Sequence, residues 1–235
     1  LARGGGEGLP PAGPARRALE LSPNEEHLER ASAAGFLGLA SWASGDLADA
    51  QRECDECVAG LKVVGYDSDA LGCAVALADI GVAQGSLGEA MRTYRQALQS
   101  APEQGGSVLR GTADMYVGMS QLHRERDDLP AATADLLRSQ ELGEHTGSPQ
   151  NRYRWRVAMA RIREAEGDLD GALDLLNEAE RLYVSDFFPN VRPVPALRAR
   201  VWVAQGRLGE AHSWVRERGL STTDDLSYLR EFEHI

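Results

Sequence analysis

Residues 45–50 read Gly-Asp-Leu-Ala-Asp-Ala, and the frame of this stretch, Leu47 followed three positions later by Ala50, recurs along the chain. The equivalent leucine–alanine pairs stand at 87 and 90, 129 and 132, 169 and 172, and 208 and 211. Successive leucines are therefore 39 to 42 residues apart. A fixed period of about 20 to 50 residues is typical of solenoids, in which each repeat packs on its neighbours.

Apolar and small residues flank each motif at helical spacing. Seven positions before the leucine stand Ala40, Ile80, Leu122, Ile162 and Val201, and seven positions after it stand Cys54, Tyr94, Leu136, Leu176 and Val215. The glycine before most of the leucines suits a left-handed helix end, and the Asp or Ser after it suits an N-cap. We therefore expect each motif to join two helices, with its leucine and alanine buried where they meet.

This pattern predicts an all-α, right-handed α-α superhelix of about five helix pairs with a period near 40 residues. We expect partial repeats at both ends, with residues 15–22 closing one repeat and residues 222–235 opening another. Residues 1–14, rich in Gly and Pro, are expected to be a flexible lead-in, and residues 15–235 one repeat domain. The chain begins with leucine and both flanking repeats are incomplete, so we expect a fragment of a longer protein.

The composition excludes several functions. Acidic residues outnumber basic ones and give a net charge of −11, which argues against direct contact with nucleic acid. No stretch is apolar enough for a membrane span, and no secretory leader precedes the repeats, so a cytoplasmic protein is expected. No Gly-x-x-x-x-Gly-Lys phosphate loop and no dinucleotide-binding glycine pattern occurs. We therefore expect neither a cofactor nor catalysis.

The cysteines and histidines suggest structural roles. Cys54 and Cys57 form a single Cys-x-x-Cys, but both fall on the apolar stripe, at positions that hold Tyr94 and Ala97 in the next repeat. Buried cysteine behaves as a small apolar residue, so we interpret both as core residues rather than a zinc or redox site. The five histidines show no helical metal-pair spacing. No metal site is predicted.

The repeat resembles the tetratricopeptide repeat (TPR). The turn at the motif and the small residues nine positions before the leucine, such as Gly38 and Ala78, match that family. Residues 18–24 (Ala-Leu-Glu-Leu-Ser-Pro-Asn) and 97–102 (Ala-Leu-Gln-Ser-Ala-Pro) resemble its second-helix end. The period departs from the usual length of about 34 residues, so longer helices or loops are expected.

Longer repeats of this kind resemble the helical sensor region of the ATP-dependent LuxR-type regulators, the family of the maltose regulator. Residues 18–21, 38–47, 204–211 and 226–234 carry this resemblance. It implies a region that receives a small-molecule inducer or a protein partner and signals to ATPase and DNA-reading modules elsewhere. The alternative is a free-standing TPR scaffold that binds a peptide or protein. Self-association is compatible with either.

A binding surface is expected on the first helix of each repeat, beside the packing stripe. The residues there differ between repeats and become rich in arginine from the third repeat onward. The predicted groove consists of Trp42, Asp79, Asp114, Gln121, Arg124, Arg154, Arg161 and Arg200. Arginine suits carboxylates and phosphates, so these side chains would hold an anionic group. The alternative is a solvated helix surface with internal ion pairs.

Overall fold

The computed structural model describes residues 27–100, 108–185 and 188–234, and these residues form α-helices and one 3-10 turn (Glu144–Thr146). The predicted lead-in, residues 1–14, and the predicted repeat end at residues 15–22 lie outside the described residues. The helices are α2 (His27–Ser44), α3 (Leu47–Val63), α4 (Asp67–Ala83), α5 (Leu87–Ser100), α6 (Thr112–Glu125), α7 (Leu129–Glu141), α8 (Asn151–Ala165), α9 (Leu169–Arg181), α10 (Val194–Ala204), α11 (Leu208–Arg218) and α12 (Tyr228–Glu231).

The repeated motif is a helix corner. Its leucine is the first residue of α3, α5, α7, α9 and α11. The residue two positions earlier has a positive φ at every corner, 84° at Gly45 and 61° at Asp127, where the glycine is replaced. In the third and fourth corners the preceding aspartate caps the helix, since Asp128 and Asp168 accept hydrogen bonds from backbone amides three residues on. The predicted stop and restart of the helix is confirmed, but the predicted N-cap is wrong at Asp46, whose side chain makes no capping hydrogen bond.

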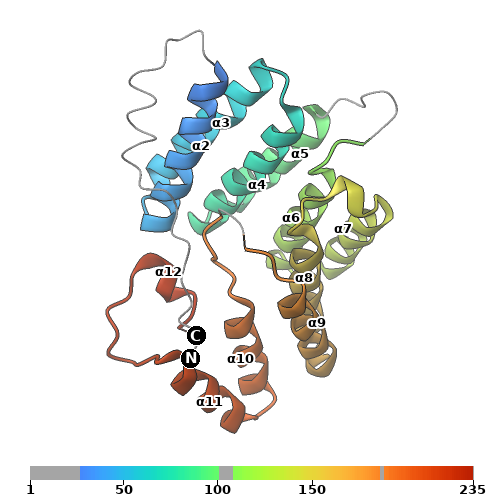
Figure 1. Ribbon diagram of the computed structural model, residues 1–235. Helices are drawn as coiled ribbons and strands as arrows, with labels where there is room; N and C mark the ends of the chain where they lie inside the picture. Colours follow the sequence, from blue (N-terminus) through green and yellow to red (C-terminus); the bar gives the residue numbers. More distant parts are fainter. Residues whose placement is uncertain (1–26, 101–107, 186–187, 235) are drawn as a thin grey trace.

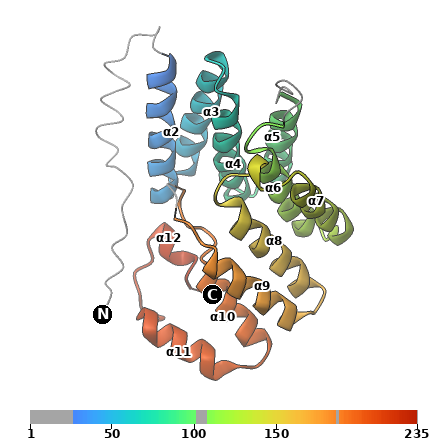
Figure 2. The same ribbon diagram turned by 45° about the vertical axis from the view of Figure 1, so that its right-hand side comes forward.

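Helix pairs α2–α3, α4–α5, α6–α7, α8–α9 and α10–α11 pack antiparallel and stack along a curved path (Figures 1 and 2). The predicted all-α superhelix is therefore confirmed. The motif alanines are all buried, as expected, because they sit where the two helices of a pair touch. The motif leucines are not: four are partly buried, and Leu208 is 54% exposed. As first residues of their helices they lie at the edge of each interface.

The core consists of clusters along the stack, each spanning neighbouring helices. Close approach depends on small residues in the first helices. A Cβ atom added to Gly38 would lie 2.6 Å from Sγ of Cys54, and one added to Gly118 would lie 2.1 Å from Cζ of Tyr94. These two glycines give α3 and α5 room to pack against their neighbours.

The end of the chain departs from the prediction that residues 222–235 open another repeat. In the described part of this segment only Tyr228–Glu231 is α-helical, and this short α12 packs against α2, at the other end of the stack (Figures 1 and 2). Tyr228 contacts Gly45 and joins the apolar cluster around Trp42. Tyr228, an aromatic residue in a mainly polar segment, thus packs against apolar side chains around Trp42 on α2 and not against α11.

Candidate functional site

A cavity of about 330 Å³ lies on the inner side of the superhelix. Its walls come from α4, α6, α8 and α10, from residues 191–193 and from the C-terminal residues Glu231, Phe232 and His234. The first helices of four successive repeats thus face a single space. Cavities of this size are ordinary for small-ligand sites.

Three arginines reach this cavity from three successive repeats: Arg124 on α6, Arg161 on α8 and Arg200 on α10. Burial lowers the pKa of Arg161 from its ordinary value, and the neighbouring positive charges of Arg124 and Arg200 lower it further. Nε of Arg161 lies 3.2 Å from the Glu164 carboxylate, and Arg124 pairs with Glu125. Arg200 is exposed and forms no ion pair within the described residues. The guanidinium groups repel one another, so an anion bound between them would relieve the repulsion.

A second feature of the inner side is a segment that we call the inner loop, residues 188–193. It begins near the end of α4 and leads into the start of α10 (Figure 1). The guanidinium of Arg192 binds the Asp79 carboxylate with both terminal nitrogens, at 2.9 and 3.1 Å. Burial alone would lower the pKa of Arg192, but the charge and hydrogen bonds of Asp79 outweigh burial and raise it.

The other anchor of the inner loop is Phe188. Its ring stands edge-on to Trp42, with ring centroids 6.5 Å apart, and the Arg154 guanidinium lies 5.0 Å from its centroid. Trp42, only 1% exposed, forms a cluster with Phe188, Val191 and other apolar side chains. T-shaped contacts between aromatic rings and cation–π contacts are both favourable, so Trp42 and Arg154 both stabilise the position of Phe188. About 40 Å³ of space remains beside the loop.

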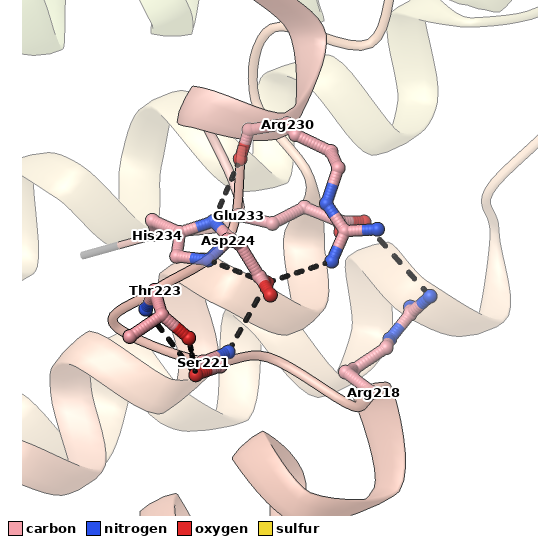
Figure 3. A network of polar contacts seen from close by, with 7 residues as sticks. All are labelled: Arg218, Ser221, Thr223, Asp224, Arg230, Glu233 and His234. Atoms are coloured by element: carbon pink, nitrogen blue, oxygen red, sulfur yellow. Dashed lines mark hydrogen bonds and ion pairs between the residues drawn. The ribbon is translucent and has the colours of Figure 1, made fainter. Parts of the chain in front are cut away.

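A network of polar contacts closes the cavity at the C-terminal side, in the segment that we call the C-terminal hook, residues 221–234 (Figure 3). The Asp224 carboxylate accepts hydrogen bonds from the Ser221 amide at 3.1 Å and from Arg230 at 2.9 Å, and it lies 3.2 Å from Nε2 of His234. The Ser221 amide first, and Arg230 next, lower the pKa of Asp224. This network places His234 at the cavity wall.

Beyond the hook lies a larger, mainly apolar hollow of about 960 Å³. It is bordered by α10, α11 and residues 220–222 and 233–234, with Val203 and Trp214 on its walls. Apart from Arg200, none of the predicted groove residues borders it.

The structure places seven of the eight predicted groove residues around the inner cavity or the inner loop. Gln121 borders both spaces, and Asp79 lies between them. Trp42 is buried under Phe188 instead of exposed. Asp114 lies apart: it is 4% exposed and accepts hydrogen bonds from the amide and hydroxyl of Ser148, at 2.7 and 2.8 Å. Asp114 therefore ties α6 to the loop before α8.

Two contributors were not recognised in the sequence. Arg192 and Phe188 were not among the predicted groove residues, although the prolines at 189 and 193 already indicated non-helical backbone before them. The alternative prediction was a helix surface with internal ion pairs. It holds for Arg124 and Arg161, because each pairs with an acidic residue on its own helix.

The cysteines lie in the core, as predicted. Cys54 and Cys57 are both buried, and burial raises the pKa of the Cys54 thiol to about 12. Cys57 lies against Cys73, with the two Sγ atoms 3.3 Å apart, a contact that the sequence did not indicate. Across residues 27–100, 108–185 and 188–234, three or more His, Cys, Asp or Glu side chains nowhere gather as a metal site would require.

Among the described residues, no helix is both long and apolar enough to cross a bilayer.

Several solved structures share the fold. A structure of the APC/C hetero-tetramer Cut9–Hcn1 matches with a TM-score of 0.62 and 14% identity, over 90% of this chain and 36% of that chain. BtubC from P. vanneervenii matches with a TM-score of 0.56 and 15% identity, over 92% of this chain and 91% of that one. A tetratricopeptide repeat protein from Parabacteroides merdae matches with a TM-score of 0.52 and 16% identity, over 88% and 70%.

These likenesses show the fold alone, and the chain spans little more than a third of the Cut9–Hcn1 chain that it matches. A search of curated proteins gives no match. The family comparison is decisive, because the model of the family described as "MalT-like TPR region" matches residues 13–235, which is nearly the whole chain. This chain therefore belongs to the family of MalT-like TPR regions.

Proposed function

We propose that this chain is the sensor and interaction region of a cytoplasmic, ATP-dependent LuxR-type transcriptional regulator. Its membership in the MalT-like TPR regions and the sequence resemblance described above support this context. The region would receive a small-molecule inducer or protein partner and leave ATP hydrolysis and DNA contact to other modules. With its net charge of −11, it would not contact nucleic acid itself.

The single observation that carries the binding proposal is the convergence of Arg124, Arg161 and Arg200 on one cavity of about 330 Å³. With Arg192, these arginines outnumber the acids Asp79, Glu125 and Glu231 of the lining, so the cavity is positive on balance in an otherwise acidic protein and attracts an anionic group. Hydrogen bonds to charged groups contribute about 1.5–3 kcal/mol each when they are sheltered from water. We infer that the ligand, or the part of a partner that enters the cavity, carries a carboxylate or phosphate.

The test is a thermal-shift screen of the purified chain against phosphorylated and carboxylated metabolites. Every compound that stabilises the chain is then titrated by calorimetry into an R161A/R200A variant. We expect at least tenfold weaker binding, which corresponds to about 1.4 kcal/mol. An R126A/R216A variant is the matched control, because it removes the same charge from residues outside the cavity lining. Unchanged binding to R161A/R200A would contradict the proposal.

The regulator context has a separate test in the open reading frame that encodes this chain. A phosphate-binding loop upstream and a helix-turn-helix downstream are expected for the regulator. Their absence would favour the alternative, a free-standing TPR scaffold, and would leave the arginine cavity as its binding site.

A further inference from the structure

The inner loop lies in the superhelix as a bound peptide would. It is non-helical and bends at residues 188, 191 and 192, it carries prolines at both ends of residues 189–193, and side chains attach it to helices far away in the sequence. We propose that its seat is a recognition site for a non-helical protein segment that presents an aromatic side chain and, four residues further on, an arginine. The inner loop occupies this seat until such a segment displaces it.

The arginine subsite is Asp79, a carboxylate that is 8% exposed on the mainly apolar helix α4. The repeat does not require an acid at this position, since the equivalent residues are Leu39, Gln121, Arg161 and Arg200. Within the described residues, Arg192 is the ion-pair partner of Asp79, and it binds both carboxylate oxygens. A buried carboxylate without a partner is costly, so Asp79 selects a guanidinium.

The aromatic subsite lies between Trp42 on α2 and Arg154 on α8. The Trp42 and Phe188 rings meet in a T-shaped arrangement, and the Arg154 guanidinium lies over the Phe188 ring, 5.0 Å from its centroid. The two subsites therefore combine residues of the first, second and fourth helix pairs. Phe188 and Arg192 are four residues apart, and this spacing is the pattern that a competing segment must reproduce.

The connection before α10 is among the long connections of the stack, like residues 101–111 before α6. Residues 64–66 suffice to join α3 to α4, whereas residues 182–193 join α9 to α10. The extra length lets the chain reach across to α2 and α4. Within the inner loop the backbone hydrogen bond is Val191 to Pro189, so side chains carry most of the attachment. A competing segment can replace those side-chain contacts without unfolding a helix.

Displacement has a thermodynamic threshold. A tethered segment acts at an effective concentration in the millimolar range, so a free peptide with the same contacts competes poorly. A natural partner must therefore add contacts beyond the two anchors. Removing the anchors of the inner loop lowers the threshold, and the seat then becomes measurable with a short peptide.

The experiment uses the F188A/R192A variant and a fluorescein-labelled peptide with the sequence of residues 184–193, Val-Ser-Asp-Phe-Phe-Pro-Asn-Val-Arg-Pro. Fluorescence anisotropy should show at least tenfold tighter binding to the variant than to the wild type. A peptide with alanine in place of its arginine should lose that gain. Adding the Asp79→Asn change to the variant should abolish binding as well. Equal binding of the peptide to variant and wild type, or no binding to either, overturns the proposal.

Two further measurements secure the interpretation. If F188A/R192A loses its helical circular dichroism, Arg192→Gln replaces it, because glutamine still donates a hydrogen bond to Asp79. The peptide should then bind with an intermediate gain that again depends on its arginine, and a gain that is independent of that arginine refutes the assignment. The R161A/R200A changes, placed in the F188A/R192A variant, should leave peptide binding unchanged. A loss there would put the peptide in the arginine cavity and overturn the proposed seat.

Discussion

The packing of α5 against α6 depends on Gly118, and its replacement by alanine gives the sharpest test of the helical packing. An alanine Cβ would lie 2.1 Å from Cζ of Tyr94 and 2.4 Å from its hydroxyl oxygen. Ordinary contact requires about 3.4 Å or more, so the ring or α6 must move by more than an ångström. Tyr94 is a fully buried ring in the middle of a core cluster, and no flexible end can give way.

The magnitude follows from two opposing terms. Overpacking a core costs about 1–3 kcal/mol, and more where the obstacle is rigid. Alanine in place of glycine within a helix recovers about 0.5–1 kcal/mol. We therefore expect Gly118→Ala to lower the free energy of unfolding by about 2 kcal/mol, since overpacking against a rigid ring outweighs the helix term.

Gly72 provides the matched control, because it also lies inside a first helix, but an added Cβ would meet nothing within 4 Å. Gly72→Ala should therefore stabilise the protein by about 0.5–1 kcal/mol. Urea unfolding followed by circular dichroism measures both variants. Tyr94→Leu should lower the free energy of unfolding less in the Gly118→Ala protein than in the wild type, by a difference of about 1 kcal/mol or more. A difference of that size is the coupling expected of two residues in contact. A Gly118→Ala protein as stable as Gly72→Ala would refute the packing described.

Three other outcomes are expected. Ala172→Leu should lower the free energy of unfolding by about 1–3 kcal/mol in urea titrations because Ala172 is fully buried, whereas the exposed Leu208 should tolerate alanine within about 0.5 kcal/mol. Cys54, whose pKa is raised to about 12, should resist iodoacetamide at pH 8.5 in the native chain but react in urea, and its stabilising effect should fall as pH rises from its unfolded pKa toward 12. Folding lowers the pKa of Asp224, so its contribution to the free energy of unfolding is present above its unfolded pKa and is lost as the pH falls through its folded pKa. Asp224→Asn should therefore speed proteolysis of the C-terminal hook at pH 7, and equal cleavage rates of the variant and the wild type would contradict this.

The repeat unit was predictable because its causes are local. A residue with positive φ and an alanine at a fixed distance act within each corner, an aspartate caps two of the helices, and the structure places a helix start at each of the five leucines. The small residues of the first helices were predictable as well, since helical spacing alone puts them on the packing face. The predicted burial of the leucines was wrong because spacing does not say how far an interface extends past the first residue of a helix.

The inner side of the superhelix was decided by tertiary structure. Asp79 and Arg192 lie 113 positions apart, and nothing in the local sequence of either residue names the other. Only the curvature of the stack brings α2 and α4 within reach of a loop between α9 and α10, which buries Trp42 under Phe188. The sequence by itself determined the helices, their corners and the arginine-rich face, because those follow from backbone geometry and periodicity. Which charges pair, and which side chains fill the inner side, depends on how the five repeats are placed relative to one another. Only the tertiary structure specifies that placement.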